Sequence, residues 1–212
     1  MKAVLIYSGG LDSTVLLHKL AKENAIVQAV SFNYGQKQII ELEYAKKNCE
    51  KLNIKHSIVD LTSIKDVFAK SALINPNIAV PKASYEKENM AVTVVPNRNM
   101  IFLSIAAALA ISNNATHVAY AAHAGDHAVY ADCTNNFANA MEKALYECDW
   151  SRIKLYSPFV NLSKIEIAKL GISLGVDFDL TWSCYEGAKT QCGKCATCIE
   201  RNNAISEALK RS

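Results

Sequence analysis

The stretch YSGGLDST, from Tyr7 to Thr14, combines two adjacent glycines, an acid and several hydroxyl side chains. It lies between the apolar run KAVLI, which is typical of a strand, and the helical pattern VLLHKL. A strand that turns into a helix through glycines leaves backbone N–H groups unpaired at the positive helix end, with no Cβ to keep an anion away. The stretch therefore predicts a phosphate-binding turn. A purely structural connector is the alternative.

Two common phosphate-binding motifs do not match this stretch. It lacks the Gly-Lys pair of the Walker loop, and Asp12 and Ser13 stand where the dinucleotide fingerprint needs a third glycine. Beside phosphates, the Asp12 carboxylate is best explained as a ligand of Mg²⁺, directly or through water. The predicted phosphate-binding residues are Tyr7, Ser8, Gly9, Gly10, Leu11, Asp12, Ser13 and Thr14.

A second group with chemical potential is a cysteine cluster near the C-terminus, formed by Cys184, Cys192, Cys195 and Cys198. Four thiolates brought to one point from so short a span are typical of a closed, structural zinc site. An iron–sulfur cluster or a redox pair is the alternative, because an all-cysteine set can hold either metal. With four ligands in place, the zinc would stabilise the fold and take no part in catalysis.

The other three cysteines are scattered, and the total of seven is odd, which opposes a disulfide framework. Cys49 shares an apolar stripe with Leu42, Ala45 and Leu52 on a predicted helix, so we interpret it as a core residue. Cys133 and Cys148 are expected to be inert thiols.

These groups must be positioned by alternating strands and helices. Short strands are predicted at residues 2–7, 26–34, 55–61 and 116–123, with helical patterns between them that include residues 38–53 and 162–175. This alternation predicts an α/β fold with a doubly wound, mainly parallel sheet covered on both faces. In the later helix, Ser163 and Glu166 suit a capping box and Gly175 a stop. Residues 62–90 show little periodicity and are interpreted as a mobile insertion near the site.

Ligands of open parallel sheets bind at the carboxyl ends of the strands, which draws attention to polar residues there. Arg98 begins a predicted helix, where a cation is disfavoured unless an anion is present, so we expect it to hold a phosphate or a carboxylate. A surface ion pair is the alternative. His123, Asp126 and His127 follow the fourth strand, and we interpret them as the polar rim of a pocket in preference to a metal site.

The pattern SGGLDST after a first strand is similar to the pyrophosphate loop of the ATP pyrophosphatase superfamily, whose members adenylate an oxygen and then displace AMP. Three further stretches resemble the 7-cyano-7-deazaguanine synthase family: SFNYGQKQIIELEYA, VPNRNMIFLSIAAALA and TWSCYEGAKTQCGKCATCIERNNA. The resemblance runs from the first strand to the last helix. It implies an adenine nucleotide alpha hydrolase-like domain over residues 1–180, followed by a zinc-binding C-terminal segment with a final helix over residues 181–212.

The resemblance also implies an ATP-dependent carbon–nitrogen ligase that converts 7-carboxy-7-deazaguanine and ammonia to the 7-cyano product through adenylated intermediates, in queuosine or related biosynthesis. Asp12, Arg98 and Asp132 are then the expected catalytic residues. The Asp132 carboxylate would accept hydrogen bonds from the guanine-like ring. The expected cofactors are structural zinc and ATP with Mg²⁺. Because 212 residues leave no room for a glutaminase domain, free ammonia or a partner should supply nitrogen.

Three alternatives to this function stay open at this point. One is an enzyme that stops at the 7-amido product, another is a tRNA-modifying adenylase with the same loop, and the third is a non-enzymatic zinc module. A formal net charge of +3 without clustered basic residues makes direct nucleic-acid binding unlikely. No apolar run is long enough to cross a membrane, and the start resembles no secretory signal. We therefore expect a cytoplasmic protein, and a homodimer is left open.

Overall fold

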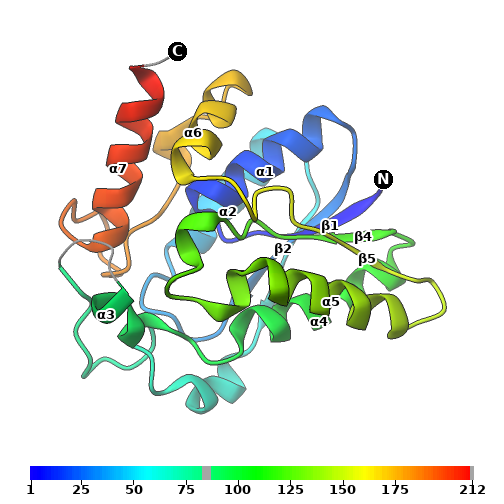
Figure 1. The fold of residues 1–212 in the computed structure, drawn as a ribbon, viewed down its shortest axis with the longest axis horizontal. Helices are drawn as coiled ribbons and strands as arrows, with labels where there is room; N and C mark the ends of the chain where they lie inside the picture. Colours follow the sequence, from blue (N-terminus) through cyan, green and yellow to red (C-terminus); the bar gives the residue numbers. More distant parts are fainter. Residues whose placement is uncertain (83–86, 211–212) are drawn as a thin grey trace.

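A five-stranded parallel sheet forms the centre of the computed structural model, which describes residues 1–82 and 87–210 (Figure 1). The strand order is β3-β2-β1-β4-β5, so the chain reverses direction across the sheet after β3. All four neighbouring pairs are parallel. The strands are β1 (Ala3–Ile6), β2 (Ile26–Asn33), β3 (His56–Asp60), β4 (His117–Ala119) and β5 (Lys154–Tyr156).

Helices cover both faces of this sheet. The α-helices are α1 (Leu11–Lys22), α2 (Glu41–Lys51), α3 (Lys87–Met90), α4 (Arg98–Ser112), α5 (Asn135–Glu147), α6 (Lys164–Ser173) and α7 (Ala196–Leu209). Short 3₁₀ turns lie at Thr62–Phe68, Ala91–Thr93, Ala124–Asp126, Ala131–Cys133 and Phe178–Leu180. Helices α4 and α5 pack on one face, whereas α1, α2 and α6 pack on the other (Figure 1). The predicted doubly wound α/β class is thereby confirmed.

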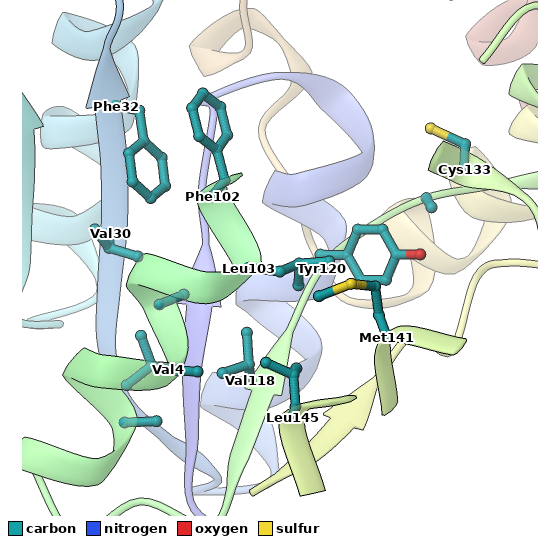
Figure 2. Close-up of a cluster of buried hydrophobic side chains, with 14 of the residues drawn as sticks. Val4, Val30, Phe32, Phe102, Leu103, Val118, Tyr120, Cys133, Met141 and Leu145 are labelled. Carbon is teal, nitrogen blue, oxygen red and sulfur yellow. The ribbon is translucent and has the colours of Figure 1, made fainter. Parts of the chain in front are cut away.

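Strand residues alternate between two apolar cores. Val4, Val30 and Val118 face α4 and α5, where Figure 2 shows them beside Leu103 and Leu145. Their neighbours Leu5, Ala29 and Ala119 face the core formed with α1, α2 and α6. Because both faces are buried, β1 is a continuous apolar run and β2 is mainly apolar, and this is why these strands were recognisable in the sequence.

Several local predictions are confirmed. Cys49 is buried on α2, as the apolar stripe indicated. Ser163 and Glu166 form the capping box of α6, and Gly175 follows that helix with a φ of +71°. A positive φ costs glycine little, which explains why the helix ends there.

Strand β5 and the segment 62–90 differ from expectation. Strand β5 has only three residues, and it is defined by its pairing with β4, not by any periodicity of its own. In the segment, Phe68 and Leu73 are buried in the core shared with α4. None of the segment's described residues, 62–82 and 87–90, lines the main cleft, but Phe68 packs on Tyr34 and Val80 packs near Trp182, both of which line it, so this part lies directly behind the cleft wall.

The C-terminal part of the chain packs directly on the sheet domain. Helix α7 lies beside α6 through Ala168, Ala204 and Ala208 (Figure 1). The Trp182 N–H donates to the Gly9 carbonyl at 2.9 Å, which ties the cysteine-bearing segment to the predicted phosphate turn. Within the described residues, no helix is both long and apolar enough to cross a bilayer.

Candidate active site

A cleft lies beyond the carboxyl ends of β1, β2 and β4, as expected for an open parallel sheet. Its walls come from the turn after β1, the segment after β2, the start of α4, the start of α6 and the cysteine-bearing segment. Residues of this cleft that matter below are Ser8, Gly10, Asp12, Ser13, Tyr34, Gln38, Glu41, Arg98, Asn99, Lys164 and Tyr185.

The turn after β1 has the geometry of an anion-binding site. Gly9 has a φ of +77°, and a Cβ there would lie 2.5 Å from the Glu41 carbonyl oxygen, so only glycine lets the turn pack against α2. Gly10 is the N-cap of α1 and has no side chain with which to cap the helix, while its own N–H donates to Ser8 Oγ at 3.2 Å. The first N–H groups of α1 therefore face the cleft at the positive end of the helix.

The predicted phosphate-binding residues divide into two groups. Ser8, Gly10, Leu11, Asp12 and Ser13 line the cleft, as does Tyr7, and the Ser8 and Ser13 hydroxyls lie 3.0 Å apart. The buried Tyr7 hydroxyl bonds instead with the buried Thr14 hydroxyl at 3.1 Å. Thr14 and Gly9 are not in the cleft lining, so their geometry favours a supporting role over direct contact with phosphate.

Asp12 lies in a cluster of charged residues drawn from three other elements. Its Oδ2 is 3.5 Å from Lys164 Nζ and 3.7 Å from His123 Nε2. Lys164 Nζ also donates to Glu200 Oε2 at 2.7 Å. Burial lowers the pKa of Lys164, but the carboxylates of Asp12, Glu200 and Asp126 outweigh it and raise the pKa above its ordinary value. Lys164 is therefore a permanent cation at the edge of the phosphate turn.

Lys164 and Glu200 were not predicted from the sequence. Lys164 starts α6 directly after its cap, and a cation at that helix end is disfavoured unless an anion is near. The same argument identified Arg98 and would have identified Lys164. Glu200 lies within α7 and carries no comparable signal, because only the packing of α7 on α6 brings it to Lys164.

The Asp12 carboxylate has a spare ligand position. Its Oδ1 is buried and has no hydrogen-bond partner among residues 1–82 and 87–210. Next to a phosphate-binding helix end, a buried and unpaired carboxylate oxygen suits a hard divalent cation such as Mg²⁺. The residues present therefore fit the predicted metal.

His123 contributes a buried imidazole to this cluster. Its Nδ1 accepts the Gly125 N–H at 3.1 Å, which places the ring proton on Nε2, facing Asp12 and Asp126. A protonated Nε2 cannot bind a metal, and His123, Asp126 and His127 do not form a metal-ligand group in the described structure. Of the three, Asp126 lines the cleft, whereas His123 is buried behind it, so the interpretation of all three as a polar rim stays a prediction.

Arg98 and Asp132 meet at the start of α4. The Arg98 guanidinium lines the cleft and lies 3.5 Å from the Tyr34 hydroxyl. Asp132 Oδ2 accepts the Asn99 N–H at 3.1 Å, and Asp132 is not in the cleft lining. Asp132 therefore caps α4 and supplies part of the negative charge that stabilises Arg98. Its predicted contact with a ring ligand is not visible in the cleft lining and stays a prediction.

The opposite wall contains a partly buried acid, Glu41. Gln36 Nε2 donates to Glu41 Oε1 at 3.0 Å and holds the carboxylate at the cleft. Burial raises the pKa of Glu41 to about 7, and the Gln36 hydrogen bond and the Arg98 charge only partly oppose this. The sequence did not reveal the raised pKa of Glu41, because an acid in the first turn of a helix is ordinarily explained by the helix dipole.

We expect Glu41 to make the stability of the ligand-free protein depend on pH. Its carboxyl holds a proton in the folded state up to about pH 7, whereas in the unfolded chain the ordinary value is 4.5. Because the unfolded state is favoured as it releases this proton, stability should fall as pH rises through that window, by at most about 3 kcal/mol. Thermal unfolding should show that the stability of Glu41→Gln relative to the wild type is higher at pH 8 than at pH 5.

Glu43 provides the matched control for this measurement, because it is an exposed acid in the same helical turn. Glu43→Gln should follow the wild type at both pH values. Equal pH dependence of Glu41→Gln and the wild type would show that Glu41 ionises normally in the folded protein.

The four predicted metal ligands do come together. The Sγ atoms of Cys184, Cys192, Cys195 and Cys198 all lie within 4.8 Å of one another. Four sulfurs on a tetrahedral zinc would be about 3.8 Å apart, given Zn–S bonds of about 2.3 Å. Among the described residues this is the only such group. The cluster thus fits a metal ion, and no further ligand position is needed.

Backbone donors prepare one of these thiols for metal binding. Cys192 Sγ accepts the N–H groups of Lys194 at 3.4 Å and Cys195 at 3.2 Å. Burial alone raises the pKa of Cys192, but these N–H donors, together with hydrogen bonds from the Cys184 and Cys195 thiols, outweigh it and lower the pKa to about 7. The thiolate, which is the form that binds metal, is therefore readily formed.

The fold and the cleft define the class of protein: a doubly wound α/β domain with a cleft at the carboxyl ends of its parallel strands. NMN synthetase from Francisella tularensis has the same fold, with a TM-score of 0.56 and 17% identity over 100% of this chain and 87% of that one. The U34-tRNA thiolase NcsA from Methanococcus maripaludis, described with its [4Fe-4S] cluster, has a TM-score of 0.53 and 14% identity over 100% and 72%.

Sequence comparison then gives the family. Residues 2–209 match the family model described as queuosine biosynthesis protein QueC. The 7-cyano-7-deazaguanine synthase of Methanoregula boonei is 51% identical over 98% of this chain and 95% of its own length. That of Caldicellulosiruptor saccharolyticus is 48% identical over 97% and 91%. The chain belongs to the 7-cyano-7-deazaguanine synthase family, a family of carbon–nitrogen ligases of queuosine biosynthesis.

Proposed function

We propose that this chain uses two molecules of ATP to convert 7-carboxy-7-deazaguanine and ammonia to 7-cyano-7-deazaguanine. The observation that carries the proposal is the placement of Asp12. Its buried, unpaired Oδ1 lies at the uncapped N-terminus of α1, in a cleft that also holds Arg98 and Lys164. This arrangement suits a nucleotide triphosphate and a carboxylate in one place. The family name supplies the identity of the acid.

The chemistry balances as two activations. A substrate carboxylate oxygen attacks the α-phosphorus of ATP and pyrophosphate leaves, then ammonia attacks the acyl carbon and AMP leaves with one carboxylate oxygen, which gives the amide. The amide oxygen attacks a second ATP, pyrophosphate leaves again, and loss of AMP and of both amide protons leaves the nitrile. No covalent enzyme intermediate is needed. The chain has to bind, orient and exclude water.

Residues of the cleft suit these tasks. The N–H groups at the start of α1 and the Ser8 and Ser13 hydroxyls would bind pyrophosphate oxygens. Lys164, held protonated by its three carboxylates, would neutralise charge that develops on the leaving pyrophosphate. Arg98 would orient the acid, because a guanidinium binds a carboxylate through two hydrogen bonds.

Two metals complete the proposal. Asp12 would hold Mg²⁺, which supplies charge neutralisation to the phosphates when bound. The four cysteines would hold structural zinc. The absence of a membrane-spanning helix in the described chain suits the cytoplasm as its location.

Oxygen labelling tests the two-activation route. If both carboxylate oxygens of the acid carry ¹⁸O, each of the two AMP molecules formed per nitrile should contain one ¹⁸O, as measured by mass spectrometry. One labelled AMP per turnover with an accumulating amide would show that the reaction stops after the first activation. Label in phosphate, with ADP as product, would rule out adenylation.

A further inference from the structure

The segment after β2 contains a buried amide with an unused acceptor. Gln38 is only 2% exposed and lines the cleft, yet its Oε1 has no hydrogen-bond partner in the described part of the chain. Leaving an amide oxygen buried and unpaired costs about 1–3 kcal/mol. A retained cost of this size at a cleft wall points to a ligand donor that would satisfy this oxygen.

Neighbouring residues hold this segment in place by several contacts. The Lys37 N–H donates to the Leu73 carbonyl at 2.8 Å, and Lys37 Nζ donates to the Ile78 carbonyl, also at 2.8 Å. Gly187, with a φ of +70°, packs so closely that a Cβ would lie 2.2 Å from the Lys37 carbonyl oxygen. Gln38 is thus fixed between the sheet domain and the cysteine-bearing segment.

Gln36 orients a second acceptor at this wall, the Glu41 carboxylate. Gln36 Oε1 accepts the Tyr34 N–H at 2.9 Å, and its Nε2 donates to the Phe32 carbonyl at 2.9 Å and to Glu41 Oε1 at 3.0 Å. Both ends of this amide are used within the protein, so Gln36 is a positioning residue. The Glu41 carboxylate and the Gln38 amide remain as acceptors at the same wall, with the Arg98 guanidinium close enough to Glu41 to affect its ionisation.

We propose that Gln38 and Glu41 determine specificity for the ring of the acid substrate by accepting hydrogen bonds from its N1–H and 2-amino groups. This inference rests on the proposed function. The guanine edge presents one acceptor, O6, followed by two adjacent donor groups, which matches a donor from Arg98 and two protein acceptors. The equivalent edge of adenine has one donor group beside an acceptor, so two protein acceptors would leave one unsatisfied.

The position of this wall also suits the reaction. Gly9 of the phosphate turn packs against the backbone of Glu41. A ring held by Gln38 and Glu41 therefore lies beside the phosphate turn, where its 7-carboxylate can meet the α-phosphate of ATP. An effective reaction needs this closeness and orientation.

Steady-state kinetics with two acids test the proposal: 7-carboxy-7-deazaguanine and its analogue without the 2-amino group. At pH 8, where Glu41 is ionised, we expect wild-type kcat/KM to favour the acid that carries the 2-amino group about 10–100-fold, because the analogue loses a hydrogen bond to a charged group. Glu41→Gln should raise KM for the natural acid by a similar factor and reduce that preference to near unity. Gln38→Met should reduce the same preference about tenfold. KM for ATP should stay within about threefold.

Glu43→Gln is the control, since it makes the same chemical change at an exposed position of the same turn. Thermal unfolding of each variant keeps a folding defect from being mistaken for lost binding. Raised KM for ATP with unchanged KM for the acid would assign this wall to adenine and overturn the proposal, as would unchanged KM for both. Failure of the wild type to convert the acid with ATP would instead count against the proposed function itself.

Discussion

Asp12→Asn should reduce ATP-dependent turnover at least about a hundredfold while the protein stays folded. The substitution removes the charge that would hold Mg²⁺ at the start of α1, and loss of one electrostatic group of this kind costs about 10²–10³ in rate. The fold should persist, because Lys164 keeps its 2.7 Å contact with Glu200. Initial rates of AMP formation, measured over a range of Mg²⁺ concentrations, should show a higher Mg²⁺ requirement for any residual activity.

Two further variants make this result interpretable. Ser8→Ala should also lower turnover, since its hydroxyl lies in the same turn and lines the cleft. Asp66→Asn removes an exposed carboxylate outside the cleft and should behave as the wild type. Near-native rates for Asp12→Asn at low Mg²⁺ would remove Asp12 from the proposed metal site.

Cys195→Ser should lower zinc content to near zero and reduce the melting temperature by roughly 10 °C. A structural zinc contributes folding free energy directly, and a loss of several kcal/mol lowers the melting temperature of a chain of this size by about 2–4 °C per kcal/mol. Activity should fall with the folded fraction. The Trp182 indole donates to the Cys184 carbonyl at 2.8 Å and the Trp182 N–H donates to Gly9, so unfolding around the metal would reach the phosphate turn.

The remaining cysteines separate metal binding from general stability. Cys148 is exposed, so Cys148→Ser should keep both zinc and melting temperature. Cys49 is buried in the core, so Cys49→Ser should lower the melting temperature yet keep the zinc. Cys133→Ser should also keep the zinc. Elemental analysis that finds folded, active protein without zinc would contradict the assignment. Iron with visible absorbance would indicate a cluster instead.

Much of the fold could be predicted from the sequence because its signals are local. Four strands were recognisable as short apolar runs, and the capping box at Ser163 fixed the start of a helix. The cysteine spacing likewise predicted a group that the structure brings together. In each case the signal lies within one short stretch of sequence, so the spacing of its residues carries the geometry. Strand β5 escaped because its three residues run directly into Ser157 and Pro158, whereas the equally short β4 is extended by the apolar residues that follow it.

The site was only partly predictable, because its contacts join residues that are distant in the sequence. Asp12 and Arg98 could be found from their positions at helix starts, whereas Glu200 reaches Lys164 across 36 positions through the packing of α7 on α6. Asp132 was expected to face the ligand, but its carboxylate accepts a hydrogen bond from α4. Burial at the cleft wall leaves the Gln38 amide oxygen without a partner in the described structure and raises the pKa of Glu41. Burial is set by the elements packed around a residue, and those elements are positioned only by the tertiary structure.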